Sequence, residues 1–254
     1  MTLELKHNPK LDLAIPEFLC DDNPIGSHLN KYPMLQNLNN YGFNCLLGKP
    51  GSGKTSLLVS FLSGKGKKKV LRKSFDNVIV VMPSSSRNSM KKNIFENHDK
   101  NKLFETLDYE TISKIKNMLH ASTANDENSL LIFDDIGAVL KSKEIQKALR
   151  LIIYNRRHLK TQIWMLLQSY ISCPLEIRKL FSNLFVFKPS KVEFENLARE
   201  TLEFDRDLAL KIMNVAYDKP HQWLMINVES QRIFKGFDEI VVHKDEEEEE
   251  EIEK

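Results

Sequence analysis

Short continuous runs of apolar residues alternate along this chain with segments in which apolar residues recur every three or four positions. A continuous run is typical of a strand buried on both faces of a parallel sheet, whereas the wider spacing is typical of an amphipathic helix. The runs predict strands at Phe43 to Leu47, Asn77 to Met82, Leu130 to Asp134, Ile163 to Leu167 and Leu184 to Phe187. The helical spacing predicts helices over Ser56 to Leu62, Tyr109 to Leu119, Ser142 to Tyr154, Ser190 to Ala198 and Asp205 to Tyr217.

Polar residues before these helices supply start signals. Ser142 precedes a periodic segment, as an N-cap residue does, and the helix over Tyr109 to Leu119 is expected to begin near Asp108. Ser190 with Glu193 has the spacing of a capping box, in which each side chain bonds the backbone N–H of the other. Two apolar segments, Trp223 to Val228 and Arg232 to Phe237, flank a short polar turn and predict a closing β-hairpin.

The alternation of strands and helices predicts an α/β fold with a mostly parallel central sheet and helices on both faces. Residues 1–40 contain two short apolar pieces, Leu11 to Ile15 and Phe18 to Leu19, punctuated by prolines, and predict a lead segment with at most one or two strands. We expect the domain to span residues 41–240 and residues 241–254 to form an acidic, disordered tail.

The charge distribution divides the chain into a basic body and an acidic end. The net charge of the 254 residues is +2, but Asp245 to Lys254 holds eight carboxylates and one lysine. Residues 1–244 therefore carry 36 basic and 27 acidic side chains. A basic body is compatible with a nucleic-acid partner. Three cysteines without metal-ligand spacing and no apolar run of bilayer length predict a soluble, intracellular protein that is neither secreted nor membrane-bound.

A complete G-x-x-x-x-G-K-[ST] motif stands between the first predicted strand and the first predicted helix, which is the context that a phosphate loop requires. Its glycines let backbone N–H groups turn toward phosphates, and the helix N-terminus adds partial positive charge. Lys54 would reach the β- and γ-phosphates, and the Thr55 hydroxyl would ligate Mg²⁺. The expected nucleotide-binding residues are Gly48, Lys49, Pro50, Gly51, Ser52, Gly53, Lys54, Thr55 and Ser56.

Paired carboxylates end the strand that begins at Leu130. A central strand of this kind delivers its last residues to the edge of the sheet where ligands bind in open α/β folds. We expect Asp134 to hold Mg²⁺ together with Thr55, and Asp135 to orient or deprotonate the attacking water. Glutamate is more usual in that second role, and Asp135 is one methylene shorter.

Gln168 ends the next predicted strand, and there it can sense the γ-phosphate or position the water. Between the strand of the phosphate loop and the strand of the acids the sequence inserts a further strand, Asn77 to Met82. This insertion indicates the ASCE, RecA-like branch of P-loop NTPases rather than the kinase or GTPase branch. A nucleoside triphosphate with Mg²⁺ is therefore the expected substrate and cofactor, and its hydrolysis the expected reaction.

An arginine supplied in trans would stabilise the transition state, and such a residue is typically worth a factor of about 10³ to 10⁵ in rate. Arg156, Arg157 and Arg178 are the candidates, and Arg156 or Arg157 is favoured over Arg178. The choice between the first two stays open.

These motifs together resemble the genome-packaging ATPases of large double-stranded DNA viruses and their virophages, within the FtsK-HerA superfamily. Within that superfamily the chain looks similar to the poxvirus-type packaging ATPase. The resemblance rests on the phosphate loop, the strand ending in Met82-Pro83-Ser84, the paired aspartates, Arg156-Arg157-His158 and the strand ending in Gln168. It covers roughly residues 41–237, whereas residues 1–40 and the acidic tail match nothing in it.

The resemblance implies a homo-oligomeric ring, a hexamer or pentamer, with ATP at subunit interfaces and double-stranded DNA in the central channel. Hydrolysis would drive DNA into a preformed capsid, and Arg156 or Arg157 would reach a neighbouring subunit's γ-phosphate. Capsid components would be further partners, and the protein would work in the host cytoplasm, in the viral factory, or with the virion.

Two other functions fit the same residues. One is a cellular or plasmid-encoded DNA-translocating ATPase, which association with capsid components would separate from a packaging enzyme. The other is a nucleotide-dependent assembly or binding switch that does no mechanical work. The switch predicts that Asp135→Asn preserves function while Lys54→Ala abolishes it, whereas a translocating motor loses function in both variants.

Overall fold

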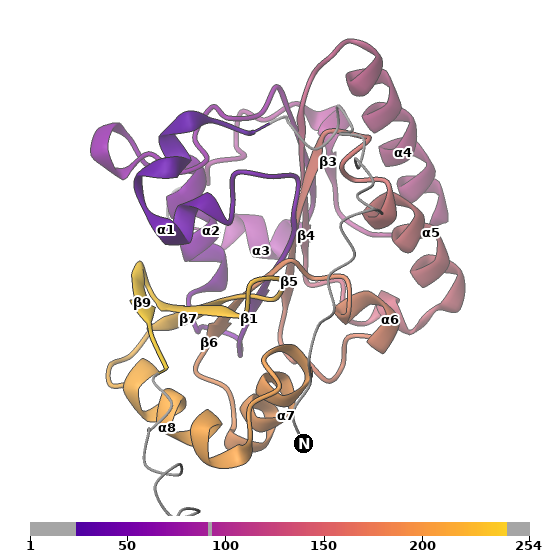
Figure 1. Ribbon diagram of the computed structural model, residues 1–254. Helices are drawn as coiled ribbons and strands as arrows, with labels where there is room; N and C mark the ends of the chain where they lie inside the picture. The colour runs from indigo at the N-terminus through magenta and orange to yellow at the C-terminus, as the bar shows by residue number, and fades with distance from the viewer. Residues whose placement is uncertain (1–23, 91–92, 243–254) are drawn as a thin grey trace, which may run out of the picture.

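A nine-stranded sheet forms the centre of the part of the chain that the computed structural model describes, residues 24–90 and 93–242 (Figure 1). The sheet order is β3-β2-β4-β5-β1-β6-β7-β8-β9. The strands are β1 (Phe43–Leu47), β2 (Asn77–Val81), β3 (Leu103–Phe104), β4 (Ser129–Asp134), β5 (Thr161–Leu167), β6 (Asn183–Phe187), β7 (Trp223–Asn227), β8 (Arg232–Lys235) and β9 (Asp238–Ile240).

The sheet is parallel from β3 to β6 and antiparallel from β6 to β9. The predicted fold class, a mostly parallel sheet with a C-terminal hairpin, is confirmed. The hairpin of β7 and β8 gains a third strand, β9, which the sequence pattern did not predict. The two-residue edge strand β3 was also missed, because two residues are too few to show periodicity.

Strand order brings three chain segments to one edge of the sheet. β5 lies between β1 and β4, with Leu47 opposite Leu167 and Asp134 opposite Leu166. The inserted strand β2 follows β1 in the chain but lies on the far side of β4. The segments after β1, β4 and β5 therefore leave the sheet side by side, at the edge that faces downward in Figure 1.

Each face of the sheet is covered by its own group of helices (Figure 1). The helices are α1 (Pro33–Gln36), α2 (Lys54–Ser63), α3 (Ser84–Asn88), α4 (Tyr109–Ala124), α5 (Lys143–Tyr154), α6 (Leu175–Arg178), α7 (Lys191–Thr201) and α8 (Arg206–Ala216), with 3₁₀ turns η1 (Ser27–Lys31), η2 (Gly66–Lys68), η3 (Lys100–Lys102) and η4 (Val139–Lys141).

The strand β5 is buried throughout because successive side chains enter opposite cores. Ile163, Met165 and Leu167 pack with residues of α4, α5, α7 and α8. Trp164 and Leu166 pack on the other side with residues of α1 and α2. A continuous apolar run was therefore the correct signal for a strand that is covered on both faces.

Four helices begin at polar residues that cap them. The side chains of Asp108, Ser142, Ser190 and Asp205 accept hydrogen bonds from the backbone N–H groups of Thr111, Ile145, Glu193 and Leu208, respectively. The predicted starts of α4, α5, α7 and α8 are thus confirmed. Helix α4 continues to Ala124, five residues beyond the predicted end.

The capping box predicted at the start of α7 is only half formed. Ser190 accepts from the backbone N–H of Glu193 at 3.2 Å, as predicted. The Glu193 carboxylate instead accepts from the backbone N–H of Tyr170 at 2.7 Å. It therefore ties α7 to the segment that follows β5 rather than to its own cap.

The start of the described chain packs into the domain. η1 and α1 place Leu29, Met34 and Leu38 in the core beside α2, so residues 24–40 hold helical turns rather than a strand. The pieces Leu11 to Ile15 and Phe18 to Leu19 and the acidic tail from residue 243 lie outside the described residues. None of the described helices has the length and apolar character needed to cross a membrane.

Candidate functional site

The loop between β1 and α2 has backbone geometry that requires its glycines. Gly51 and Gly53 have φ of 74° and 110°, in the left-handed region that disfavours side chains. A Cβ on Gly48 would lie 2.6 Å from Ser52 Oγ and 2.8 Å from Phe187 Cβ. The spacing of the glycines in the motif therefore reflects local steric need at three positions.

The N-terminus of α2 is open toward the loop. Gly53 caps the helix without a side-chain hydrogen bond, and the first turn contains no acidic residue. The buried hydroxyl of Ser52 has no hydrogen-bond partner among the described residues. Unpaired N–H groups, a helix dipole and an unpartnered hydroxyl fit the oxygens of a nucleotide's phosphates.

Lys54 folds its ammonium back over the loop. Its Nζ donates to the carbonyl oxygens of Gly48 at 2.6 Å and Lys49 at 3.1 Å. Burial lowers the pKa of this ammonium, and the charges of Asp134 and Asp135 oppose that effect. The two acids therefore act electrostatically on the loop lysine, which places all three residues in one site.

Asp134 and Asp135 differ in environment although they are adjacent. Asp134 is 7% exposed, and burial and then the charge of Asp135 raise its pKa to about 6, while Lys54 lowers it. Asp135 is exposed and has φ of 55°, a left-handed conformation that aspartate tolerates better than most residues. The turn after β4 thus directs the two carboxylates differently.

Gln168 lies beside the second acid, as its place at the end of β5 predicted. Its Nε2 donates to Asp135 Oδ1 at 3.1 Å. The amide and the carboxylate come from neighbouring strands and form one polar pair at the edge of the sheet. Such a pair can hold a water molecule by one donor and one acceptor.

The residues at this edge fit a magnesium ion bound mainly through a nucleotide. Among the described residues, no group of three or more His, Cys, Asp or Glu side chains could hold a metal ion. Mg²⁺ in phosphate-transfer sites is usually bound by one or two protein oxygens, by phosphates and by water. The buried carboxylate of Asp134, whose ionised form is disfavoured without a cation, fits that role with the Thr55 hydroxyl.

The structure does not bring Arg156 and Arg157 to this edge of their own chain. The carbonyl of Arg156 accepts from the N–H of Thr161, the first residue of β5, whereas Gln168 follows the last. A seven-residue strand, about 20 Å long, therefore separates the arginines from the acids. Arg156 is half-buried and donates to the Ile153 carbonyl at 2.9 Å, whereas Arg157 is exposed.

Arg178, the third candidate, is held within its own chain. It makes a two-bond pair with the Glu200 carboxylate, at 3.0 and 2.8 Å, and its guanidinium lies 5.1 Å from the centre of the Tyr170 ring. A charge reaching a neighbouring subunit from this position would have to break that pair.

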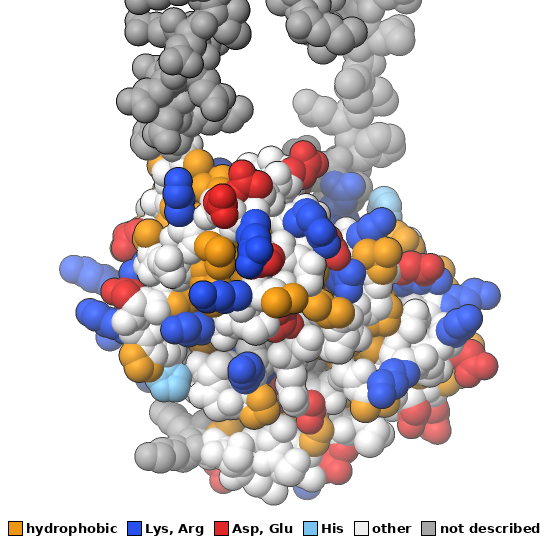
Figure 2. All heavy atoms as spheres, turned by 90° about the horizontal axis from the view of Figure 1, so that it is seen from below, with side chains coloured by type: hydrophobic (Ala, Val, Ile, Leu, Met, Phe, Trp, Pro, Cys, Tyr) orange, Lys and Arg blue, Asp and Glu red, His pale blue; other side chains and the backbone are white. Residues whose placement is uncertain are grey.

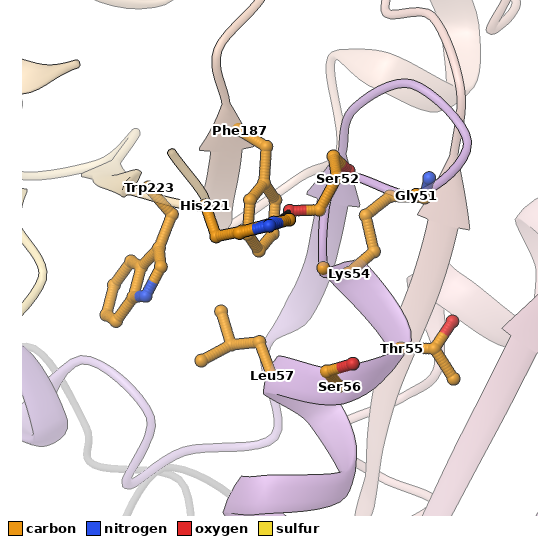
Figure 3. A pocket seen from close by; sticks show the side chains of 10 residues that line it. Gly51, Ser52, Lys54, Thr55, Ser56, Leu57, Phe187, His221 and Trp223 are labelled. Atoms are coloured by element: carbon orange, nitrogen blue, oxygen red, sulfur yellow. Dashed lines mark hydrogen bonds between the residues drawn. The ribbon is translucent and has the colours of Figure 1, made fainter. Parts of the chain in front are cut away.

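A pocket of about 580 Å³ lies against the phosphate loop, and part of its lining was not predicted. Besides residues 51–57 it is lined by Phe187, His221 and Trp223 (Figure 3). Phe187 and Trp223 are cross-strand neighbours of β6 and β7, and His221 Nδ1 donates to the Ser52 carbonyl at 3.0 Å. Only the antiparallel pairing of β7 beside β6 brings these residues to the loop, and no local sequence signal shows that pairing.

Basic side chains on the face below this edge do not form one uninterrupted patch. Figure 2 shows Lys and Arg side chains spread over that face, with acidic and hydrophobic side chains between them. The visible part of this face therefore presents mixed charge rather than a continuous basic surface.

Comparisons with known proteins show one family, through a family model, and one fold, through solved structures. The family model described as Poxvirus A32 protein matches residues 31–254. A search of curated proteins finds no match to the chain. The crystal structure of B204, the DNA-packaging ATPase of Sulfolobus turreted icosahedral virus, is 16% identical with a TM-score of 0.56, over 80% of this chain and 98% of that one.

Two structures of the genome packaging NTPase B204 from Sulfolobus turreted icosahedral virus 2 give similar values. The complex with AMPPCP is 14% identical with a TM-score of 0.55, over 80% of this chain and 98% of that one. The complex with ATP-gammaS is 16% identical with a TM-score of 0.56, over 76% and 95%. At these identities the likeness shows the fold.

Proposed function

The chain belongs to the Poxvirus A32 protein family of viral packaging ATPases, and from this membership we propose that it is an ATP-driven motor that moves double-stranded DNA into a preformed capsid. The observation that carries the proposal is the meeting of three segments at one sheet edge. They are the phosphate loop after β1, the paired acids at the end of β4 and Gln168 after β5.

Each residue at the edge has a defined role in this proposal. The loop N–H groups and Lys54 bind the phosphates. Thr55 and Asp134 would hold Mg²⁺, which would neutralise charge on the phosphates. Asp135 accepts a proton from the attacking water, and Gln168, bonded to Asp135, orients that water. The shorter aspartate side chain requires the water to lie close to the strand end.

The proposal assigns the positive charge that stabilises the transition state to an arginine of a neighbouring subunit. Arg156 and Arg157 lie at the opposite end of β5, so they could reach a phosphate only across an interface between two copies of the chain. A ring of five or six copies around DNA provides such interfaces. We place its work in the host cytoplasm, in the viral factory or with the virion.

ATP hydrolysis measured with and without double-stranded DNA, together with mass determination in the presence of nucleotide, tests this function. We expect DNA to stimulate hydrolysis and nucleotide to favour a multimer. A persistent monomer whose rate of ATP hydrolysis does not change with DNA would contradict the motor and favour the nucleotide-dependent switch. Association with capsid components would separate a packaging motor from a cellular DNA-translocating ATPase.

A further inference from the structure

The proposed function leaves open how the chain holds the base of the nucleotide. Phosphates bound at the start of α2 leave the nucleoside two ways to extend, one on each side of that helix. A cavity is lined in part by α2 on each side, and the two cavities differ in chemistry.

The cavity on one side of α2 is polar. It measures about 570 Å³ and is lined by Thr55, Val59, Met90 and five serines. None of the described residues that line it is aromatic. A purine entering it would therefore find hydroxyl groups and no flat surface on which to stack.

The cavity on the other side is larger and aromatic. It measures about 680 Å³, and Tyr32, Phe61, Trp223 and Phe237 are among its lining residues. It shares Leu57 and Trp223 with the pocket at the phosphate loop, so the two pockets lie next to each other at these side chains. In Figure 3, Trp223 and Leu57 stand on the side of the pocket away from Thr55.

The indole of Trp223 is fixed by other aromatic rings. The ring centres of Phe185, Phe237 and Phe61 lie 5.6, 5.8 and 6.4 Å from it. Residues held in this way lose little freedom on binding, so the surface they present is pre-organised. His221, bonded to the Ser52 carbonyl, fixes the segment before Trp223 against the phosphate loop.

From this geometry we propose that the purine base of the bound nucleotide stacks on Trp223, where the two pockets meet, and that it also contacts Leu57. The inference rests on the proposed ATP-binding function and names the residue that holds the base. Stacking is tolerant of base identity, because each base has a π-face. Purines should therefore bind more tightly than pyrimidines, since their stacking surface is larger.

Equilibrium binding of ATP and of inorganic tripolyphosphate to the full chain tests the stacking site. Trp223→Leu keeps an apolar side chain against Phe185 but removes the aromatic face. We expect its affinity for ATP to fall about 10-fold or more while its affinity for tripolyphosphate stays unchanged. Met90→Ala, in the polar cavity, is the matched control and should leave both affinities unchanged.

Tryptophan fluorescence gives a second measurement that needs no destabilising change. The chain has two tryptophans, and Trp164 is fully buried, so a ligand can contact only Trp223. ATP should change the emission of the wild-type chain, whereas tripolyphosphate should not. Trp223→Phe should abolish the change while retaining most of the ATP affinity.

The outcomes distinguish the two proposals. Equal loss of ATP and tripolyphosphate binding in Trp223→Leu, or loss of ATP binding in Met90→Ala, would overturn the stacking site alone. A wild-type chain that binds neither ligand would overturn the proposed function and the stacking site with it.

Discussion

At the residue scale, the site divides into groups that bind the nucleotide and groups that act on water. Lys54 belongs to the first set, because its ammonium lies over the loop that would hold the phosphates. Asp135 and Gln168 belong to the second, because they bond each other at the exposed strand ends. The two sets should therefore respond differently to substitution.

Asp135→Asn should retain ATP binding and lose hydrolysis by at least about 100-fold, because it removes the acceptor for a proton of the attacking water. Lys54→Ala should lose both, because it removes the phosphate contact. Binding assays and steady-state hydrolysis on the two variants check this. Hydrolysis retained in Asp135→Asn would remove that residue from the mechanism.

The ionised Asp134 carboxylate, which the proposed Mg²⁺ site requires, should lower the stability of the fold. Its pKa is about 6 in the folded chain against an ordinary value of 3.8, so the folded state binds more protons than the unfolded state between these values. Stability contributed by the protonated form is complete below about pH 4 and is lost as the pH rises through 6. The carboxylate at pH 8 therefore opposes folding by up to about 3 kcal/mol.

Asp134→Asn removes that penalty, so the variant should be more stable than the wild type at pH 8 and lose its advantage toward pH 4. Denaturant unfolding at both pH values, without nucleotide and with a chelator present, measures the difference. The same variant should be inactive, because it weakens the proposed Mg²⁺ site. An unchanged difference between pH 8 and pH 4 would contradict the raised pKa.

At the element scale, helix α7 supports the site through one side chain. Glu193 accepts from the backbone N–H of Tyr170, two residues after Gln168, while Ser190 caps the same helix. The first contact holds the segment after β5, and the second serves the helix alone. Substitutions at Glu193 and Ser190 can therefore distinguish an effect on the position of the site from an effect on the stability of the helix.

Glu193→Ala should lower the rate of ATP hydrolysis as well as the free energy of unfolding, because it releases the segment that carries Gln168. Ser190→Ala, the matched control, should cost about 1 kcal/mol of stability and leave the rate unchanged. Chemical denaturation and kcat measured on both variants check this prediction. Equal rates in the two would show that Glu193 is only structural.

The elements show what the sequence could predict and why the rest was missed. Apolar runs located β1, β2, β4, β5 and β6, and the two hairpin segments located β7 and β8. Capping residues located the starts of α5 and α7, and helical spacing located α4 and α8, because these signals are local. Glu193 has the spacing of a capping box, but its carboxylate accepts from the backbone N–H of Tyr170, a residue distant in sequence. Trp223 was predicted in a strand, yet its place at the phosphate loop depends on pairing with β6.

At the scale of the whole molecule, one chain does not contain a complete proposed site. Arg178 is paired with Glu200, and the two favoured arginines lie at the far end of β5. The proposed mechanism therefore requires an assembly in which one copy supplies an arginine to the phosphate loop of another.

Mixing two inactive variants tests this requirement. Lys54→Ala lacks a working phosphate loop but retains its arginines, whereas Arg157→Ala retains the loop. In a mixed assembly, some interfaces would pair the intact loop of one variant with the intact arginine of the other. We expect the mixture to regain hydrolysis that neither variant shows alone. Arg156→Ala is tested in the same way. If neither mixture hydrolyses ATP faster than its two variants do separately, neither arginine acts in trans.

The most direct test of the motor is displacement of a third strand from linear double-stranded DNA. A protein that moves along the duplex strips a triplex-forming strand from its path, whereas a switch that only binds does not. We predict displacement that requires ATP and is absent in Lys54→Ala and Asp135→Asn. Robust ATP hydrolysis by the wild-type assembly on that DNA, with no displacement of the third strand, would contradict the account.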